Sequence, residues 1–330
     1  MKAITGIQPT NTLHIGNLFG AVLPAVQMQN DYDLLMMIAD LHAITDQKTL
    51  QNPTALRKNI LFLTAAYLAA GIDPEKTTLF QQSQISAHNE LGWIFTCLTS
   101  MSDLENMTQY KDKNKDKKIL RPWTGLFIYP TLMAADILLY DSQVVPIGED
   151  QKQHLELTKH LAEKFNYFYN TTFIIPKPII QKEGARILGL DDPAKKMSKS
   201  AASAKNYISI TDDADTIVKK IKAAVTDSIS GITLDDARPG LKNLLTIFSL
   251  SSGESRESIT ERFANKGMKD LKDATAEALI DFLTPIQQKM TTLLADETAL
   301  IEIINRGSDQ AKTIATAKIK MVKEKMGLVL

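Results

Sequence analysis

The sequence predicts an α/β protein in which a doubly wound parallel sheet is followed by an all-helical C-terminal domain. Short apolar runs alternate with helical stretches up to about Lys205, which is typical of a parallel sheet. Beyond that residue almost every segment has helical periodicity, and no run is typical of a buried strand. A chain of 330 residues is also long enough for two domains. We therefore expect an α/β domain over residues 1–205 and a helical domain over residues 206–330.

Four strands are expected in the first domain, at residues 1–7, 33–40, 78–81 and 142–147. The first leads through the polar residues 8–12 into a helix that begins near Leu13, with Thr12 or a neighbour as its cap. The second is a nearly continuous apolar run, typical of a strand that is buried on both faces.

Helical segments fill the intervals between the strands and the whole of the second domain. In the first domain they are residues 53–70, ended by Gly71, and residues 89–108, 131–140 and 151–165. We expect Asp150 to cap the last of these, with Gln153 reaching back to complete a capping box. In the second domain the helices are residues 213–225, 243–249, 254–263, 271–295 and 308–326, with residues 238–240 as a turn.

Composition excludes several classes of protein. With 44% hydrophobic and 23% charged residues, the chain is neither disordered nor rich in membrane-spanning runs. The N-terminus turns polar before a signal sequence could be completed, so we expect a cytoplasmic protein. Basic and acidic residues balance at 38 each, so a nucleic-acid partner would need a local patch. The single Cys97 and five scattered histidines predict no metal site, and Cys97 is expected to fill the core.

The segment after the first strand could bind an anion. A polar loop that runs into a helix N-terminus offers free backbone N–H groups and the positive end of the helix dipole. His14 and Asn17 are three residues apart, so on a helix both could donate to a phosphate, while Gly16 would let a planar ring approach. A plain turn between strand and helix is the simpler interpretation of this segment taken alone.

A second segment, residues 195–200, places Lys196 and Lys199 in a serine-rich loop. Two lysines three apart can bind a polyphosphate as point charges. Solvated surface is the usual interpretation of such a charged run. Met197, lying among these charges, indicates instead a loop with an apolar anchor that docks in one position.

A third segment, residues 129–139, is apolar on all sides except for Asp136. A buried carboxylate without a partner is costly by roughly several kcal/mol, so something must satisfy it. A structural ion pair is one interpretation. The other is a specificity residue that accepts a hydrogen bond from a substrate, with Met133 lining the same pocket.

These segments together resemble a known family. His14 to Asn17 resembles the HIGH element, and Lys196 to Ser200 matches the KMSKS element, of the class I aminoacyl-tRNA synthetases. Residues 129–139 and the run GEDQKQH at 148–154 closely resemble the tryptophanyl family of bacterial type, and the resemblance covers nearly the whole chain. It implies a Rossmann-like fold, with a C-terminal domain that binds the tRNA anticodon.

The resemblance also implies the reaction and its residues. The substrates would be L-tryptophan, ATP as its Mg²⁺ complex, and tRNA(Trp), and the protein would be a homodimer that does not bind membranes. His14, Asn17, Lys196 and Lys199 would be catalytic. The residues implied to bind ATP are Gln8, Pro9, Thr10, Gly16, Asn17, Gly148, Glu149, Asp150, Ile187, Lys196, Met197, Ser198, Lys199 and Ser200. Those implied to bind tryptophan are His42, Tyr129, Met133, Asp136 and Gln151, with Asp136 accepting the indole N–H.

Three alternatives stay open. A tyrosyl enzyme would share both ATP elements, but Asp136 and the run at 148–154 argue against it. A paralogue that binds RNA without catalysis would be expected to lack one of the ATP elements, and a nucleotidyltransferase would lack the long helical part. Residues 306–330, with six basic and two acidic side chains, are one candidate surface for tRNA, and a solvated helix face is the other interpretation.

Overall fold

The first domain is built on a parallel sheet. The computed structural model describes residues 1–10, 13–108, 110–111, 123–148, 151–180, 187–199 and 203–329. Within them, the strands are β1 Lys2–Ile7, β2 Asp33–Ile38, β3 Thr77–Gln81, β4 Val144–Ile147 and β5 Lys177–Ile180. All pairings are parallel, in the order β3-β2-β1-β4-β5, which confirms the predicted Rossmann-like fold. The chain reverses its strand order between β1 and β4, and ligands of such sheets bind at the carboxyl ends of the strands at that point.

Four of these strands lie where the sequence predicts them, whereas β5 was not predicted. This strand has only four residues and contains Pro178, which interrupts the alternating pattern. Proline is tolerated there because β5 is at the edge of the sheet.

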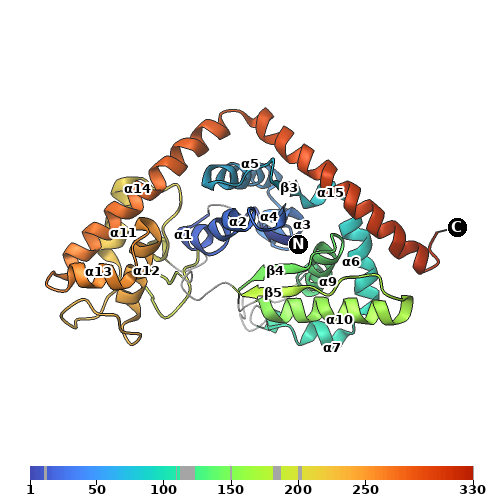
Figure 1. The fold of residues 1–330 in the computed structure, drawn as a ribbon, viewed down its shortest axis with the longest axis horizontal. Coiled ribbons are helices and arrows are strands. Elements are labelled where there is room, and N and C mark those ends of the chain that lie inside the picture. Colours follow the sequence, from blue (N-terminus) through green and yellow to red (C-terminus); the bar gives the residue numbers. More distant parts are fainter. Residues whose placement is uncertain are drawn as a thin grey trace.

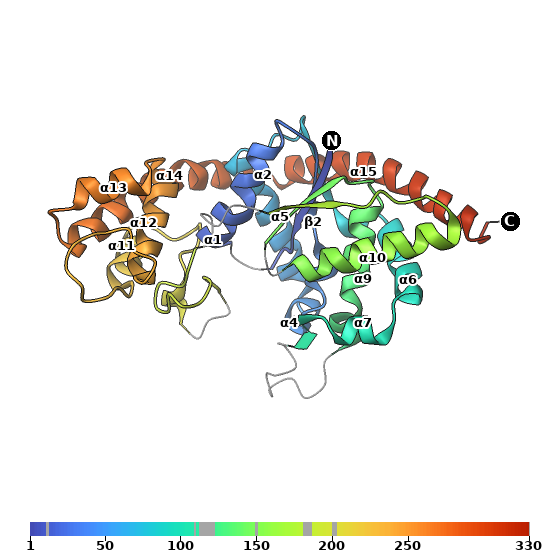
Figure 2. The same cartoon turned by 60° about the horizontal axis from the view of Figure 1, so that its bottom comes forward.

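Helices cover both faces of the sheet (Figures 1 and 2). Residues 15–28 form α1 Ile15–Asn17, a π-helical turn Leu18–Val22 and α2 Leu23–Met28. The other helices of the first domain are α3 Asp40–Ala43, α4 Gln47–Leu50, α5 Pro53–Ala70, α6 Ala87–Leu98, α7 Met101–Glu105, α9 Thr124–Leu138 and α10 Lys152–Tyr169. One core joins α2 and α5 to side chains such as Leu34 and Met36, and the other joins α6, α9 and α10 to Leu35 and Phe80.

Some predicted helices are confirmed and others need correction. Helix α5 ends as predicted at Gly71, whose φ of 115° favours glycine. The single helix predicted for residues 89–108 is wrong, because Thr99 is extended and Ser100 starts α7 with its own capping box. Helix α9 begins at Thr124, seven residues before the predicted start, and continues through Pro130.

The role predicted for Gln153, completing a capping box at the start of α10, is wrong. Gln151 is the N-cap of α10 and makes no side-chain cap bond, while Asp150 lies outside the described residues. The amide of Gln153 instead accepts from the backbone N–H of Thr108 at 2.8 Å and donates to the carbonyl of Asn106 at 2.9 Å. Gln153 therefore joins α10 to the segment after α7.

The later helices are α11 Ala214–Ala223, α12 Pro239–Ser252, α13 Arg256–Phe263, α14 Met268–Leu294 and α15 Glu297–Lys325. Residues 238–240 are not a turn, because Pro239 is the first residue of α12, where its missing N–H costs nothing. Cys97 is exposed on α6 beside Trp93, one turn earlier, so it does not fill the core as expected.

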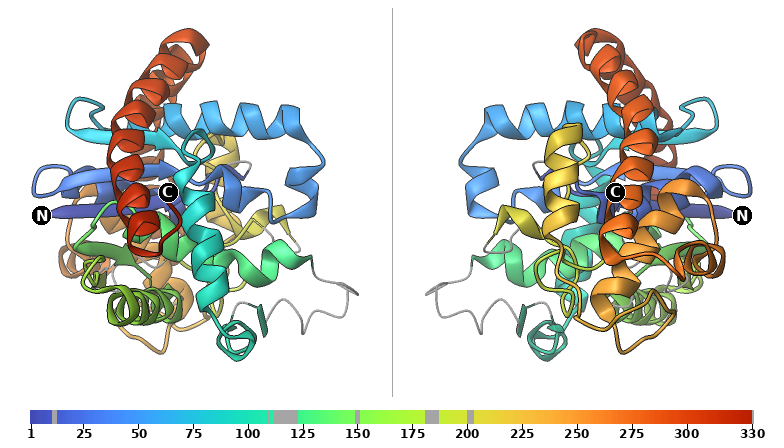
Figure 3. Two further views of the ribbon diagram at one scale, coloured as in Figure 1. Left: turned by 90° about the vertical axis from the view of Figure 1, so that its right-hand side faces the viewer. Right: turned by 90° about the vertical axis from the view of Figure 1, so that its left-hand side faces the viewer.

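Helix α15 leaves the other late helices and lies along the first domain (Figures 1 and 3). A Cβ atom on Gly307 would lie 1.9 Å from the carbonyl oxygen of Leu79, so the helix backbone packs directly on the edge strand β3.

Most basic side chains of α15 are engaged with the first domain. They pair Arg306 with Glu75, Lys318 with Asp141 and Lys323 with Glu90, and Lys325 donates to Thr171. These side chains hold the helix in place, which argues against residues 306–330 as the tRNA surface. The division at residue 205 stays a prediction.

Candidate active site

His14 is the N-cap of α1, so it lies directly before the first helical residue, Ile15. Its ring Nδ1 accepts from the backbone N–H of Asn17 at 3.3 Å, and the Asn17 side-chain oxygen accepts from the backbone N–H of His14 at 3.3 Å. Because Nδ1 accepts, the proton of a neutral ring is on Nε2. This reciprocal capping leaves the Nε2–H of His14 and the side-chain NH₂ of Asn17 as donors. The predicted shared helix face is wrong, because His14 precedes the helix.

Burial, and then the positive charges of Lys199 and Lys196, lower the pKa of His14 to about 4. The imidazole is therefore neutral at pH 7 and acts as a hydrogen-bond donor without a positive charge.

The absence of a side chain at Gly16 leaves room for the His14 ring. A Cβ atom on Gly16 would lie 2.9 Å from both Cε1 and Nδ1 of His14 and 3.7 Å from Cβ of Met197. The planar group that approaches this glycine is the imidazole of the same segment.

The segment that follows the lysine loop is paired with the start of this helix. The backbone N–H of Ile15 donates to Ile208 at 3.0 Å, and that of Ile210 donates to Leu13 at 3.0 Å. Residues 13–15 and 208–210 thus form a short antiparallel ladder. It holds together two segments that are almost two hundred residues apart.

Met197 anchors the lysine loop. Its side chain is only 2% exposed, and its N–H donates to Ile187, which is also buried. The N–H of Ser198 donates to the side-chain oxygen of Asn206, which is itself buried. The loop is therefore fixed by apolar and polar contacts at its centre, and Lys196 is exposed.

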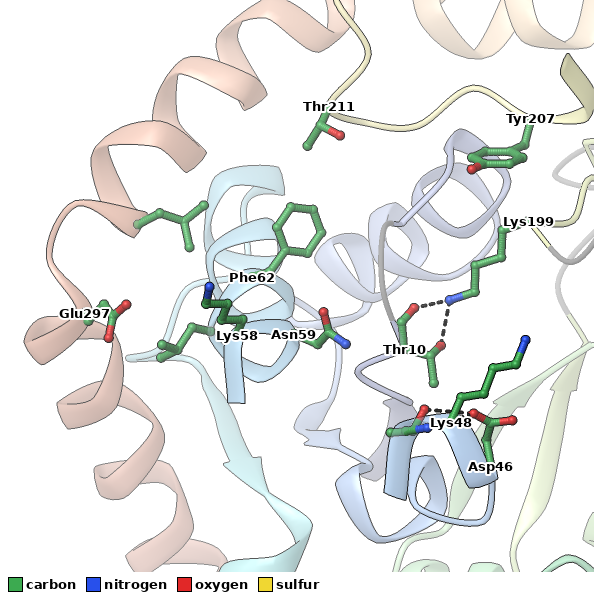
Figure 4. A pocket seen from close by; sticks show the side chains of 13 residues that line it. Thr10, Asp46, Lys48, Lys58, Asn59, Phe62, Lys199, Tyr207, Thr211 and Glu297 are labelled. Carbon is green, nitrogen blue, oxygen red and sulfur yellow. Dashed lines mark hydrogen bonds between the residues drawn. The ribbon is translucent and has the colours of Figure 1, made fainter. Parts of the chain in front are cut away.

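Lys199 contacts the loop after β1. Its Nζ donates to the carbonyl oxygen of Thr10 and to Thr10 Oγ1 at 2.9 Å. Both residues line a cleft of about 930 Å³ that is also bordered by α5, Tyr207 and the junction of α14 with α15 (Figure 4). Lys48 and Lys58 lie at the same cleft, which is large enough for a nucleotide.

The other residues expected at ATP lie at the carboxyl ends of the two central strands. Gln8 and the buried Pro9 follow β1, and Gly148 follows β4 and accepts from the N–H of Gln151 at 3.0 Å. This is where the strand order reverses. Glu149, Asp150 and Ser200 lie outside the described residues.

Tyr129, Met133 and Asp136 occur on one face of α9, at spacings of four and three residues. The hydroxyl of Tyr129 bonds to Nε2 of His154 at 2.6 Å, and its ring lies edge-on to His42 with centroids 6.1 Å apart. The structure therefore brings Tyr129, His42 and Asp136 together.

Asp136 is buried and has three hydrogen-bond partners among the described residues. Its carboxylate bonds to His42 and His88 at 2.6 Å each and to the amide of Gln82 at 2.8 Å. Burial would raise the pKa of Asp136, but the charge and hydrogen bond of His42 and the bond from His88 outweigh it and lower the pKa to about 2. The carboxylate is ionised at neutral pH.

Gln82 and His88 were not predicted from the sequence as site residues. Gln82 follows the carboxyl end of β3, and His88 is in the first turn of α6. A polar residue directly after a buried strand was the available signal, since binding residues of such sheets gather there. Among the described residues, no group of three or more His, Cys, Asp or Glu side chains is placed to hold a metal ion.

Comparison with known proteins identifies the family. The family described as tRNA synthetases class I (W and Y) matches residues 1–284. A tryptophan–tRNA ligase of Caldanaerobacter subterraneus subsp. tengcongensis is 47% identical over 330 residues, which cover 100% of this chain and 99% of that protein. The chain belongs to the tryptophanyl branch of the class I tRNA synthetases.

Solved structures of tryptophanyl-tRNA synthetases agree with this family. The one from Mycoplasma pneumoniae has a TM-score of 0.91 at 35% identity, covering 99% of this chain and 98% of that chain. The Campylobacter jejuni enzyme complexed with ADP and tryptophan has a TM-score of 0.84 at 36% identity, covering 99% and 100%. The synthetase fold therefore extends over both the sheet and the late helices.

Proposed function

We propose that the protein activates L-tryptophan with ATP and transfers it to tRNA(Trp). The tryptophan carboxylate attacks the α-phosphate of ATP, forming tryptophanyl-adenylate and releasing pyrophosphate. A terminal hydroxyl of the tRNA then attacks the acyl carbon and releases AMP. The observation that carries the proposal is the ladder that joins the His14 segment to the lysine loop, combined with a buried, ionised Asp136. The Campylobacter relative, complexed with ADP and tryptophan, supports both small substrates.

The ATP phosphates would lie among four donors. Neutral His14 and Asn17 would donate from the helix start, and Lys196 and Lys199 would supply positive charge from the loop. No protein nucleophile is required, because the attacking carboxylate is already ionised. Catalysis would therefore come from positioning and from charge stabilisation of the pentavalent phosphorus and the leaving pyrophosphate. Mg²⁺ would be bound chiefly by ATP oxygens, since it keeps several waters and prefers phosphate.

The indole ring would bind beside α9. Tyr129, Met133 and His42 would form the pocket wall, and Asp136 would accept the indole N–H. A charged acceptor in an apolar pocket favours a ligand that has a donor and rejects one that leaves it unpaired. Gln151, at the start of α10, would contact the α-amino group with Tyr129.

The late helices would bind the tRNA anticodon. Helices α11 to α13 lie away from the sheet, α14 packs on α5, and α15 is fixed along the sheet (Figure 1). We place the anticodon-binding surface within residues 206–330 but outside the paired face of α15.

We further propose that the protein is a cytoplasmic homodimer. Trp93 and Met101, on α6 and the start of α7, are 68% and 64% exposed, which is unusual for large apolar side chains and fits a subunit interface. Among the described helices, none is long and apolar enough to cross a membrane. Sedimentation of the wild type and of Trp93→Glu tests the dimer, and a monomeric wild type would contradict it.

The experiment that tests the function is charging of tRNA. Labelled tryptophan, ATP and Mg²⁺ are incubated with the protein and tRNA(Trp), with tRNA(Tyr) as control. We expect acid-precipitable label that depends on ATP and on tRNA(Trp). Absence of charging, in a protein that still binds this tRNA, would favour the non-catalytic paralogue.

A further inference from the structure

The Asp136 carboxylate has one acceptor position left after its bonds within the protein, and that position is on Oδ2. An ionised carboxylate has about four acceptor sites, two on each oxygen. His88 Nδ1, at 2.6 Å, and Gln82 Nε2, at 2.8 Å, both bond to Oδ1. In the part of the chain that the structure describes, His42 Nε2, at 2.6 Å, is the one donor to Oδ2. Oδ1 is therefore filled, and Oδ2 can accept one more hydrogen bond.

His88 is oriented by a third group. It is fully buried, and its Nε2 bonds to the hydroxyl of Tyr140 at 2.8 Å. Burial, and then the negative charge of Asp136, raise the pKa of Tyr140, so its hydroxyl keeps its proton and can donate it to Nε2. When the Tyr140 hydroxyl donates to Nε2, the ring proton of His88 is on Nδ1, facing Asp136. Phe80 stacks on the imidazole with an interplanar angle of 21° and holds the plane of the ring.

Gln82 is oriented from the other side. Its side chain is fully buried, and its Oε1 accepts from the backbone N–H of Leu41 at 3.1 Å. This bond decides which end of the amide faces Asp136, namely the NH₂ group. Since Leu41 precedes His42 in α3, Gln82 also ties the carboxylate to the helix that bears its other partner.

We propose that His88 and Gln82 are positioning residues that hold Oδ1, so that Oδ2 faces the indole N–H of tryptophan. The inference rests on the proposed function, in which Asp136 accepts that N–H. A carboxylate with two donors on one oxygen cannot rotate about its Cβ–Cγ bond without breaking both. The acceptor is thus aimed before the ligand arrives, which strengthens its discrimination between ligands with and without the donor.

The test compares tryptophan with its analogue that has sulfur in place of the indole nitrogen. Binding constants for both ligands are measured on the wild type, His88→Leu, His88→Asn and Tyr140→Phe, together with melting temperatures. We expect the wild type to bind tryptophan about a hundredfold or more tightly than the analogue. The analogue has no N–H to donate, so it would bury the charged Asp136 carboxylate without this hydrogen bond. In His88→Leu the preference should fall at least tenfold. Asparagine can place an N–H near the position of Nδ1, so His88→Asn should keep most of the preference.

Tyr140→Phe tests the same chain without a large change in volume. Loss of the hydroxyl removes the hydrogen bond at Nε2 that fixes the orientation of the imidazole, so its Nδ1–H is held less firmly toward Oδ1 of Asp136. We expect the preference for tryptophan to fall about fivefold or more, in line with the loss of one buried hydrogen bond. This variant carries the test if His88→Leu does not fold.

Thr64→Val is the matched control for a buried polar group. Thr64 is fully buried in α5, and its hydroxyl donates to the carbonyl of Ile60 at 2.9 Å. It should lower the melting temperature and leave the preference at the wild-type value.

If His88 and Tyr140 are only structural, their variants should behave like Thr64→Val, and a preserved preference would overturn the inference. A wild type without any preference would instead contradict Asp136 as the indole acceptor, and the inference would fail with it.

Discussion

Replacing Gly16 by alanine should lower the rate of adenylate formation and leave the free energy of unfolding nearly unchanged. The new Cβ would lie 2.9 Å from two atoms of the His14 ring, closer than carbon atoms tolerate, so the ring must move. Movement breaks the 3.3 Å bond from the Asn17 N–H to Nδ1 and displaces the Nε2–H donor. Loss of such a cap lowers the free energy of unfolding by about 1 kcal/mol. Alanine in place of glycine within a helix raises it by about the same amount. The free energy of unfolding should therefore change little.

The rate of adenylate formation should fall much further. If His14 donates to the phosphate in the transition state, its displacement should lower the rate by about a hundredfold to a thousandfold. Single-turnover adenylation, tryptophan affinity and chemical denaturation are measured on Gly16→Ala. Gly125→Ala is the control, because a Cβ there would lie 3.8 Å from Thr45 Cγ2, an ordinary contact. A Gly16→Ala enzyme with wild-type adenylation would refute the role given to the His14 ring.

Three further predictions concern the lysine loop, His14 and α15. Lys199→Ala should lower the adenylation rate about a hundredfold, with tryptophan affinity unchanged, and weakened tryptophan binding would contradict this role. Native His14, with its pKa lowered to about 4, stays neutral where the unfolded chain takes up a proton. The free energy of unfolding should therefore fall between pH 6.5 and 4, by about 3 kcal/mol more in the wild type than in His14→Gln, and parallel profiles would contradict the shift. Gly307→Ala should lower the free energy of unfolding by about 2–3 kcal/mol in urea, because its Cβ would overlap Leu79, and unchanged stability would refute the direct packing of α15 on β3.

The sheet was predictable where its strands are buried on both faces. The run at β2 has an almost unbroken apolar sequence because both cores pack on it. The edge strand β5 is only four residues long and contains Pro178. Its sequence therefore lacks the continuous apolar run that identified β2. The break between α6 and α7 depends on the extended Thr99 and the Ser100 cap, which are local features that helical periodicity does not register.

Long-range contacts account for what the sequence could not predict at the site. The spacing of His14 and Asn17 indicated a pair of donors, but the capping bonds that fix the ring proton required coordinates. The ladder between residues 13–15 and 208–210 joins two distant segments, and nothing in either sequence indicates that they pair. Asp136 was identified as a carboxylate in need of a partner, yet its partners come from three separate elements that only the fold brings together.

Pyrophosphate exchange into ATP, measured with each standard amino acid in turn, tests the assignment to tryptophan most directly. Exchange requires only ATP, Mg²⁺ and the amino acid, so it is independent of tRNA. With Asp136 as acceptor for the indole N–H, tryptophan should support exchange at least about a thousandfold better than tyrosine, the discrimination expected when the wrong ligand leaves a buried polar group unpaired. Comparable exchange with tyrosine, or exchange with neither amino acid, would contradict it.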